Sequence, residues 1–176
     1  MAIPLTPDRP QTDPATAFAI ADTLHRMYHA LDTRDWQRLE SCFTPNVYTD
    51  FTSLLGGLPE TEAAPVLTNK WKALSSGFDS AMHSIVNGWV TYDRMKSGLR
   101  TAGYAANMRT SGVLQNDLGL PPIWGIEGRY YYDLVLNYDH WLVAGITVQL
   151  HVEHGDRQLL NLAIERAMQT TESVAA

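Results

Sequence analysis

Two residues that lie far apart in the sequence have side chains suited to moving a proton: Asp32, in LDTRDWQRLESCF, and His83, in AMHSIVNGW. Imidazole changes its protonation state near neutral pH, so a histidine in an apolar pocket can act as a general base. A carboxylate that hydrogen bonds to the second ring nitrogen orients the ring and stabilises the imidazolium ion. We therefore predict that Asp32 and His83 form a catalytic pair.

Each of the two residues also has a structural interpretation. Asp32 ends an apolar helical face and can be a cap or loop carboxylate, although an acid at the end of a helix meets the unfavourable end of the helix dipole. His83 can be a strand histidine that hydrogen bonds to a backbone carbonyl. Strand alternation places His83, Ile85, Asn87 and Trp89 on one face, which predicts an amide close to the imidazole.

Aromatic and polar residues near these segments are candidates to line a substrate pocket. Tyr28 lies one helical turn before Asp32, and Tyr48 lies on a short strand where its hydroxyl can donate to a substrate oxygen. Aromatic residues at strand spacing also form ordinary protein cores, and this interpretation stays open. The predicted substrate-binding residues are Tyr28, Tyr48, Phe51, Asn87, Tyr104, Met108, Trp124 and Tyr130.

Helical periodicity comes first in this chain, and strand periodicity follows it. Apolar spacing predicts a helix from Asp13-Pro14 to Asp32, helices over 35–43 and 61–74, a turn at Thr44-Pro45-Asn46, a strand over 47–51 and a Gly-rich loop over 54–59. Strand periodicity then predicts four strands, at Met82–Tyr92, Leu99–Thr110, Gly125–Asn137 and Trp141–His151. A loop is predicted over 111–122, and a closing helix at Asp156–Met168. This order predicts an α+β domain with helices packed on one curved antiparallel sheet.

Composition excludes several classes of protein. The 176 residues carry a formal net charge of −6 and only 13 Lys and Arg, without the basic cluster that a nucleic-acid-binding surface requires. No apolar run reaches the roughly 18 residues that span a membrane, and the first residues do not resemble a secretory signal. The single Cys42 cannot form an intrachain disulfide. We expect a cytoplasmic protein without a nucleic-acid or membrane partner.

The histidines do not predict a metal site. His25 and His29 are spaced i, i+4 on a helix, but no carboxylate stands at the usual place beside them. Within the segment 151–154, alternation along a strand places His151 and Glu153 on one face and His154 on the other. The sequence also lacks a Gly-rich phosphate loop and a Ser nucleophile elbow. We predict neither a metal nor an organic cofactor.

Several motifs together resemble those of one protein family. The segment YHALDTRDWQRL at 28–39 is followed by Phe43, Thr44-Pro45, Asp50, His83, Asn87, Glu127-Gly128-Arg129-Tyr130 and Trp141-Leu142-Val143. Over residues 15–155 the chain resembles the SnoaL-like domains of the nuclear transport factor 2-like superfamily. Within that superfamily it is most similar to scytalone dehydratase and to bacterial dehydratases and dehydrochlorinases. The resemblance implies a cone-shaped, cystatin-like α+β fold with an internal pocket.

The resemblance also implies roles for single residues. In these dehydratases an Asp at the end of the first helix orients a His on the first long strand, and the His removes a proton from the carbon beside the leaving group. Asp32 and His83 match these two positions. The chain departs from the dehydratase pattern at Leu31, Phe51, Ser111, Tyr130 and Tyr132. These departures imply a different substrate and leave a different reaction open.

The predicted function is a cofactor-free lyase that acts on a small apolar cyclic or aromatic substrate. An isomerase or polyketide cyclase that uses the same pair is one alternative. A non-catalytic domain, similar to the small subunits of ring-hydroxylating dioxygenases, is another. We expect a flexible arm over 1–12, the SnoaL-like domain over 13–155 and a C-terminal helix and tail over 156–176. The resemblance further implies a homodimer or homotrimer formed through the outer face of the sheet.

Overall fold

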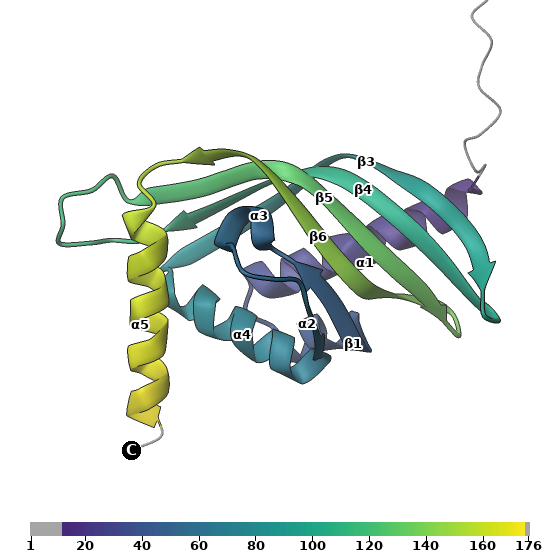
Figure 1. Cartoon of the computed structure of the whole chain (residues 1–176), viewed down its shortest axis with the longest axis horizontal. Coiled ribbons are helices and arrows are strands. Elements are labelled where there is room, and N and C mark those ends of the chain that lie inside the picture. The colour runs from purple at the N-terminus through teal and green to yellow at the C-terminus, as the bar shows by residue number, and fades with distance from the viewer. Residues whose placement is uncertain (1–11, 175–176) are drawn as a thin grey trace, which may run out of the picture.

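The computed structural model describes residues 12–174, and its main feature is a strongly curved sheet that arches over the helices (Figure 1). Helices α1 and α4 lie beneath the arch, and α5 stands at one end of it. The predicted α+β class with a curved sheet wrapped against helices is confirmed. The predicted arm lies, apart from Thr12, outside the described residues.

Helix α1 (Pro14–Asp32) packs against the concave face of the sheet. The carboxylate of Asp13 accepts a hydrogen bond from the main-chain N–H of Thr16 at 3.0 Å, and Pro14 occupies the first turn, where it removes no helical hydrogen bond. Apolar residues at i, i+4 and i+7 spacing, including Ile20, Leu24 and Met27, are fully buried. The predicted first helix is confirmed along its whole length.

The short elements that follow differ from the prediction. Helix α2 (Trp36–Ser41) is shorter than expected because Asp35 is its N-cap, accepting from the main-chain N–H of Arg38. Strand β1 (Phe43–Asp50) begins before the turn predicted at Thr44-Pro45-Asn46, so that turn is wrong. Its pairing with β6 is irregular between Phe43 and Tyr48, and Pro45 lies within this irregular part of the strand, where a proline is tolerated.

A short helix and a short strand replace the predicted loop over 54–59. Helix α3 (Thr52–Leu55) begins directly after Phe51, and the four-residue strand β2 (Glu60–Ala63) pairs with β1. Helix α4 (Ala64–Gly77) consequently begins three residues later than predicted and ends three residues later. Pro65 lies in its first turn, as expected.

Four long strands form most of the sheet: β3 (Ser80–Lys96), β4 (Leu99–Val113), β5 (Ile123–Asn137) and β6 (His140–His154). The order across the sheet is β2-β1-β6-β5-β4-β3. All neighbours are antiparallel except β1 and β6, which are parallel, so the prediction of a wholly antiparallel sheet is corrected at this point. The hairpin between β5 and β6 turns at Tyr138, which has a φ of 51°.

The interior has two apolar clusters. The larger lies between the sheet and α1, and the smaller lies where α5 (Gln158–Val174) covers α4 and the end of β5. Helix α5 approaches α4 closely, since a Cβ atom built on Gly77 would lie 2.0 Å from the carbonyl oxygen of Ala163. No helix within residues 12–174 is long and apolar enough to cross a membrane.

Candidate active site

Asp32 and His83 contact each other through two hydrogen bonds. His83 Nδ1 lies 2.6 Å from Asp32 Oδ1, and the main-chain N–H of His83 donates to Asp32 Oδ2 at 2.9 Å. The side chain of His83 is only 12% exposed, and that of Asp32 is 21% exposed. Because an ionised carboxylate can only accept hydrogen bonds, the neutral ring carries its proton on Nδ1. The lone pair of Nε2 is therefore available to accept a proton.

The end of α1 places the Asp32 carboxylate. Thr33 caps the helix: its main-chain N–H and its hydroxyl both donate to the carbonyl of His29, at 2.9 and 2.7 Å. Arg34 then adopts a φ of 59°, which turns the chain away from the helix axis. A carboxylate meets the unfavourable end of the helix dipole here. The hydrogen bonds from His83 offset that cost.

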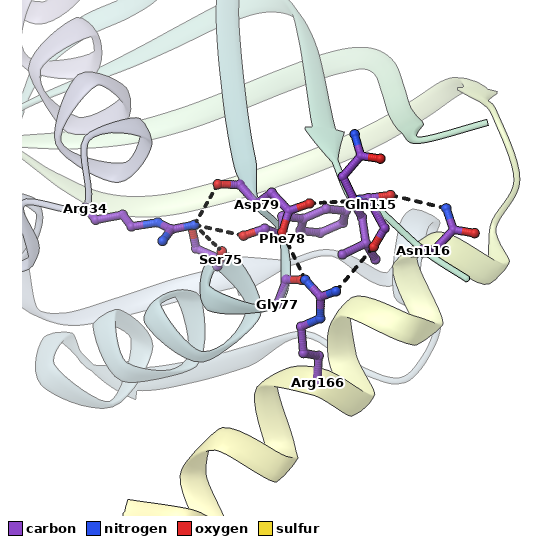
Figure 2. Close-up of polar contacts among 9 residues, drawn as sticks. Arg34, Ser75, Gly77, Phe78, Asp79, Gln115, Asn116 and Arg166 are labelled. Atoms are coloured by element: carbon purple, nitrogen blue, oxygen red, sulfur yellow. Dashed lines mark hydrogen bonds and ion pairs between the residues drawn. The ribbon is translucent and has the colours of Figure 1, made fainter. Parts of the chain in front are cut away.

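Arg34 joins the end of α1 to the start of β3. Its Nη2 donates to the carbonyls of Ser75, Phe78 and Asp79, at 3.3, 2.8 and 3.3 Å (Figure 2). These carbonyls lie at the C-terminal end of α4 and in the connection to β3, where carbonyl groups lack helical partners. His83 follows shortly after on β3. The guanidinium therefore holds the two segments that carry the predicted catalytic pair.

A second arginine attaches α5 to the same connection. Arg166 Nη1 donates to the carbonyl of Gly77 at 3.4 Å and pairs with Asp79 Oδ1 at 3.0 Å, and its Nη2 donates to the carbonyl of Gln115 at 3.3 Å (Figure 2). Asp79 Oδ2 also accepts from the main-chain N–H of Gln115 at 2.7 Å. The backbone hydrogen bond from Gln115, with a smaller contribution from Arg166, lowers the pKa of Asp79.

Tyr28 holds one face of the imidazole. The rings of Tyr28 and His83 are stacked, with centroids 5.0 Å apart and an interplanar angle of 25°. The Tyr28 hydroxyl lies 2.9 Å from that of Tyr132, which in turn donates to the sulfur of Met108 at 3.8 Å. Burial raises the pKa of both tyrosines well above the ordinary value. Both phenols are therefore neutral at physiological pH.

His83 lines an apolar cavity of about 160 Å³ between the concave sheet face, α1, α3, α4 and α5. An apolar cavity of about 150 Å³ is large enough to hold a benzene molecule, so the space suits a ligand of about one ring. The cavity is lined by Tyr28, Leu31, Phe51, Leu54, Leu55, Trp71, Leu74, Ser75, Phe78, Ala81, His83, Met108, Thr110, Ser111, Gly112, Trp124, Ile126, Tyr130 and Leu160.

One wall of the cavity is held by a polar network that joins three elements. The indole N–H of Trp124 donates to Glu153 Oε1 at 2.7 Å, and Arg157 Nη1 donates to Glu153 Oε2 at 2.6 Å. Arg157 Nη2 donates to the carbonyl of Leu54 at 2.5 Å. The Trp124 ring also stacks on Phe78, with centroids 6.0 Å apart. The network thus joins α3, β5 and β6 to the segment that precedes α5.

The sequence model of the SnoaL-like domain family matches residues 16–147, which is most of the chain. The chain belongs to the SnoaL-like family. No curated protein matches its sequence significantly.

Solved structures resemble this SnoaL-like domain at low sequence identity. The Kfla4162 protein of Kribbella flavida has a TM-score of 0.75 at 20% identity, covering 85% of this chain and 99% of the other. A candidate scytalone dehydratase of Novosphingobium aromaticivorans has a TM-score of 0.65 at 12% identity, covering 79% and 86%. A hexachlorocyclohexane dehydrochlorinase, LinA type 2, has a TM-score of 0.61 at 15% identity, covering 81% and 89%. At these identities the likeness establishes the fold.

Most of the predicted site residues of the SnoaL-like domain come together at this cavity. Asp32 contacts His83 behind the cavity wall. Of the predicted substrate-binding residues, the cavity is lined by Tyr28, Phe51, Met108, Trp124 and Tyr130. Their roles toward a substrate remain predictions.

Three predicted substrate-binding residues lie elsewhere. Tyr48 is 40% exposed, because the alternation of β1 turns Val47 and Thr49 inward instead. Asn87 is exposed and has a φ of 52°. It lies within a register irregularity between Val86 and Trp89, which interrupts the strand alternation. The prediction that His83, Ile85, Asn87 and Trp89 share one face is therefore wrong beyond residue 86. Tyr104 is buried against Tyr132, with ring centroids 6.4 Å apart, and does not line the cavity.

Sequence reasoning missed several cavity residues. Trp71 and Leu74 lie on the apolar side of the helix predicted over 61–74, so the signal for them was present. Leu54 and Leu55 fell in a predicted loop, and Leu160 fell on a distant helix. Thr110 stands at the end of a predicted strand with no distinguishing motif. Only the register of β4 against β3 places it opposite His83.

The described residues contain no group of three His, Cys, Asp or Glu side chains placed to hold a metal ion. Arg109 is 66% exposed and lies 3.5 Å from Glu127. His154 contacts the same Glu127 carboxylate at 3.2 Å. These charged residues lie away from the cavity.

Proposed function

We propose that this SnoaL-like domain is a lyase in which His83 Nε2 removes a proton from carbon in a small, mainly apolar cyclic substrate. The contact of His83 with Asp32, at the wall of a one-ring cavity, is the observation that carries the proposal. A base must lie within hydrogen-bonding distance of the proton it takes, and His83 is the imidazole that lines this cavity.

The proposed step conserves protons and electron pairs. The C–H bond breaks, its proton moves to Nε2, and its electron pair forms a new C=C bond as the leaving group departs from the neighbouring carbon. Asp32 Oδ1 accepts from Nδ1–H throughout and stabilises the imidazolium ion. When the leaving group is hydroxide, the proton on Nε2 is returned to it, and water is released.

The apolar lining of the cavity favours a substrate with few charged groups, because burying an unpaired charge there is strongly unfavourable. Two structural relatives support elimination, because one is named as a dehydratase and the other as a dehydrochlorinase. Isomerisation is the second candidate. The same Nε2 can return its proton to another carbon, and within residues 12–174 the cavity lining includes no second imidazole or carboxylate to assist a leaving group.

The test compares the wild-type protein with His83→Gln and Asp32→Asn on a panel of monocyclic alcohols and hydroxyketones in D₂O, followed by NMR. Loss of water identifies a lyase, and migration of a double bond with deuterium incorporation but without loss of water identifies an isomerase. We expect both variants to lose at least about 1,000-fold in rate while remaining folded. His151→Ala, which changes an exposed strand histidine, is the matched control. Turnover that survives in His83→Gln would contradict the proposal.

A further inference from the structure

Thr110 is the cross-strand neighbour of His83 on β4, and both residues line the cavity. Directly opposed residues on one sheet face have Cβ atoms about 4.5–5.5 Å apart, so the Thr110 hydroxyl lies beside the imidazole. Thr110 Oγ1 is buried and forms no hydrogen bond within the described part of the chain. A buried hydroxyl without a partner is costly, which points to a partner that the folded chain does not itself supply.

Tyr130 adds a second hydroxyl to the same region. Its side chain is only 4% exposed and lines the cavity. Burial raises the pKa of Tyr130 to about 12, and a hydrogen-bonding interaction with the Thr110 hydroxyl acts in the opposite direction, so the two hydroxyls lie close together although Thr110 Oγ1 makes no hydrogen bond of regular geometry with the described residues. Tyr130 is therefore a neutral donor at physiological pH. By contrast, the hydroxyls of Tyr28 and Tyr132 are paired with each other at 2.9 Å.

The cavity lining is mainly apolar, with a few polar side chains that include His83, Thr110 and Tyr130. His83 supplies a base, Thr110 and Tyr130 supply hydroxyl donors close to it, and most of the remaining lining is carbon. A hydrocarbon or halogenated ring would offer neither hydroxyl a strong acceptor. A ring that carries a carbonyl oxygen would provide one.

We propose that the hydroxyls of Thr110 and Tyr130 form a subsite that binds the carbonyl oxygen of a monocyclic ketone or enone. The catalytic part of this inference rests on the proposed function: the bound carbonyl acidifies the C–H bond on the neighbouring carbon. His83 Nε2 takes that proton, and the electron pair of the broken bond forms the C=C bond of an enolate. Negative charge moves to the oxygen, where the two hydroxyls stabilise it.

Binding tests the subsite without relying on turnover. The probes are cyclohex-2-enone and cyclohexene, which share ring size and differ in the oxygen, and calorimetry measures their affinities for the full chain. We expect the enone to bind at least about 10-fold more tightly, because cyclohexene offers the two donors no acceptor. The carbonyl stretching band of bound cyclohex-2-enone should move to lower frequency than in an apolar solvent.

Two variants remove the donors one at a time. Tyr130→Phe retains the ring that stacks on Tyr132, and Thr110→Val retains the shape of the side chain. We expect each variant to lose most of the preference for cyclohex-2-enone and part of the infrared shift, with an unchanged far-ultraviolet circular dichroism spectrum and an unchanged midpoint of urea unfolding. Tyr131→Phe is the matched control, because the Tyr131 hydroxyl donates to Gln149 at 3.3 Å, away from the cavity.

Equal affinity for the two probes in the wild-type protein would overturn the proposal and leave the hydroxyls as a site for water. A preference that both donor variants retain would overturn it as well. His83→Gln separates this inference from the proposed function. If the preference persists in that variant but the wild-type protein catalyses no proton exchange, the subsite stands and the lyase proposal fails.

Discussion

Each carboxylate oxygen of Asp32 contacts a different nitrogen of His83: Oδ1 lies 2.6 Å from the ring Nδ1, and Oδ2 accepts from the main-chain N–H at 2.9 Å. One carboxylate thus fixes the imidazole relative to the backbone of its own strand. The ring cannot rotate about χ1 or χ2 without losing the bond at Nδ1. Tyr28 restricts the ring further by stacking on its face.

Asp32→Asn should reverse the tautomer of His83. The amide oxygen can still accept from the main-chain N–H, but the amide nitrogen then donates to Nδ1 and moves the ring proton to Nε2. We expect a rate loss of about 1,000-fold or more, since Nε2 no longer accepts a proton. Histidine ¹⁵N NMR measures the tautomer directly. Asp139→Asn, in an exposed turn, is the control, and an unchanged His83 tautomer in Asp32→Asn would contradict the assignment.

Arg34→Ala should weaken both stability and activity. The substitution removes hydrogen bonds to three carbonyls at the junction of α4 and β3. We expect the free energy of unfolding in urea to fall by about 1–2 kcal/mol, with a further loss of kcat because Asp32 and His83 are held less firmly. Arg38→Ala is the control: Arg38 pairs with Asp35 at 3.5 Å on the surface and should change stability by less than about 0.5 kcal/mol. Equal effects of the two variants would refute the role given to Arg34.

Gly77→Ala should push α5 away from α4. The new Cβ would lie 2.0 Å from the carbonyl oxygen of Ala163, and backbone atoms cannot relieve that overlap without a shift of the helix. We expect a loss of about 1–3 kcal/mol in stability, measured by urea unfolding, and weaker ligand binding because Leu160 moves with α5. Ser76→Ala, at the exposed neighbouring position, should have little effect. Full stability of Gly77→Ala would show that the two helices are not packed this closely.

Alkaline pH should unfold the protein by ionising buried tyrosines. Burial raises the pKa of Tyr130 to about 12 and holds those of Tyr28 and Tyr132 well above the ordinary value. An unfolded tyrosine ionises near pH 10, so the unfolded state loses protons first as the pH rises. These residues make their full contribution to the free energy of unfolding below about pH 10. That contribution falls as the pH rises through 12, by about 3 kcal/mol for Tyr130 alone.

Absorbance at 295 nm, recorded with near-ultraviolet circular dichroism, measures this transition. We expect the last tyrosines to ionise together with the loss of the circular dichroism signal. Tyr130→Phe should weaken the dependence of stability on pH in the alkaline range, and Tyr131→Phe should change this dependence less. Smooth ionisation of every tyrosine near pH 10 with the fold intact would contradict the burial of these rings.

The elements that could be predicted from the sequence are those with a long, uninterrupted apolar period. Ile20, Leu24 and Met27 follow one helical stripe, and α1 was predicted to the residue at which it ends. Strand β2, of sequence ETEA, has no apolar alternation and forms only because β1 offers it an edge. Asn87 was misplaced for a related reason: a register irregularity shifts strand phase, and a strict period of two cannot represent it.

The contact of Asp32 with His83 could be predicted because both residues stand at the ends of recognisable elements within a family pattern. The residues that form the remainder of the cavity wall could not be predicted from the sequence. Phe78 and Leu160 enter the wall through the packing of α5 on α4, which depends on the fit of Gly77 against Ala163. Such contacts are made between helices distant in sequence and have no local signature.

Leu160 lines the cavity from a helix that follows residue 147, where the match to the SnoaL-like family ends. The proposed catalytic pair and this part of the cavity wall are therefore carried by separate parts of the chain. Substitutions on α5 can change the outline of the cavity without altering the contact of Asp32 with His83. The selectivity for a ligand and the proposed proton transfer are thus separable by mutation.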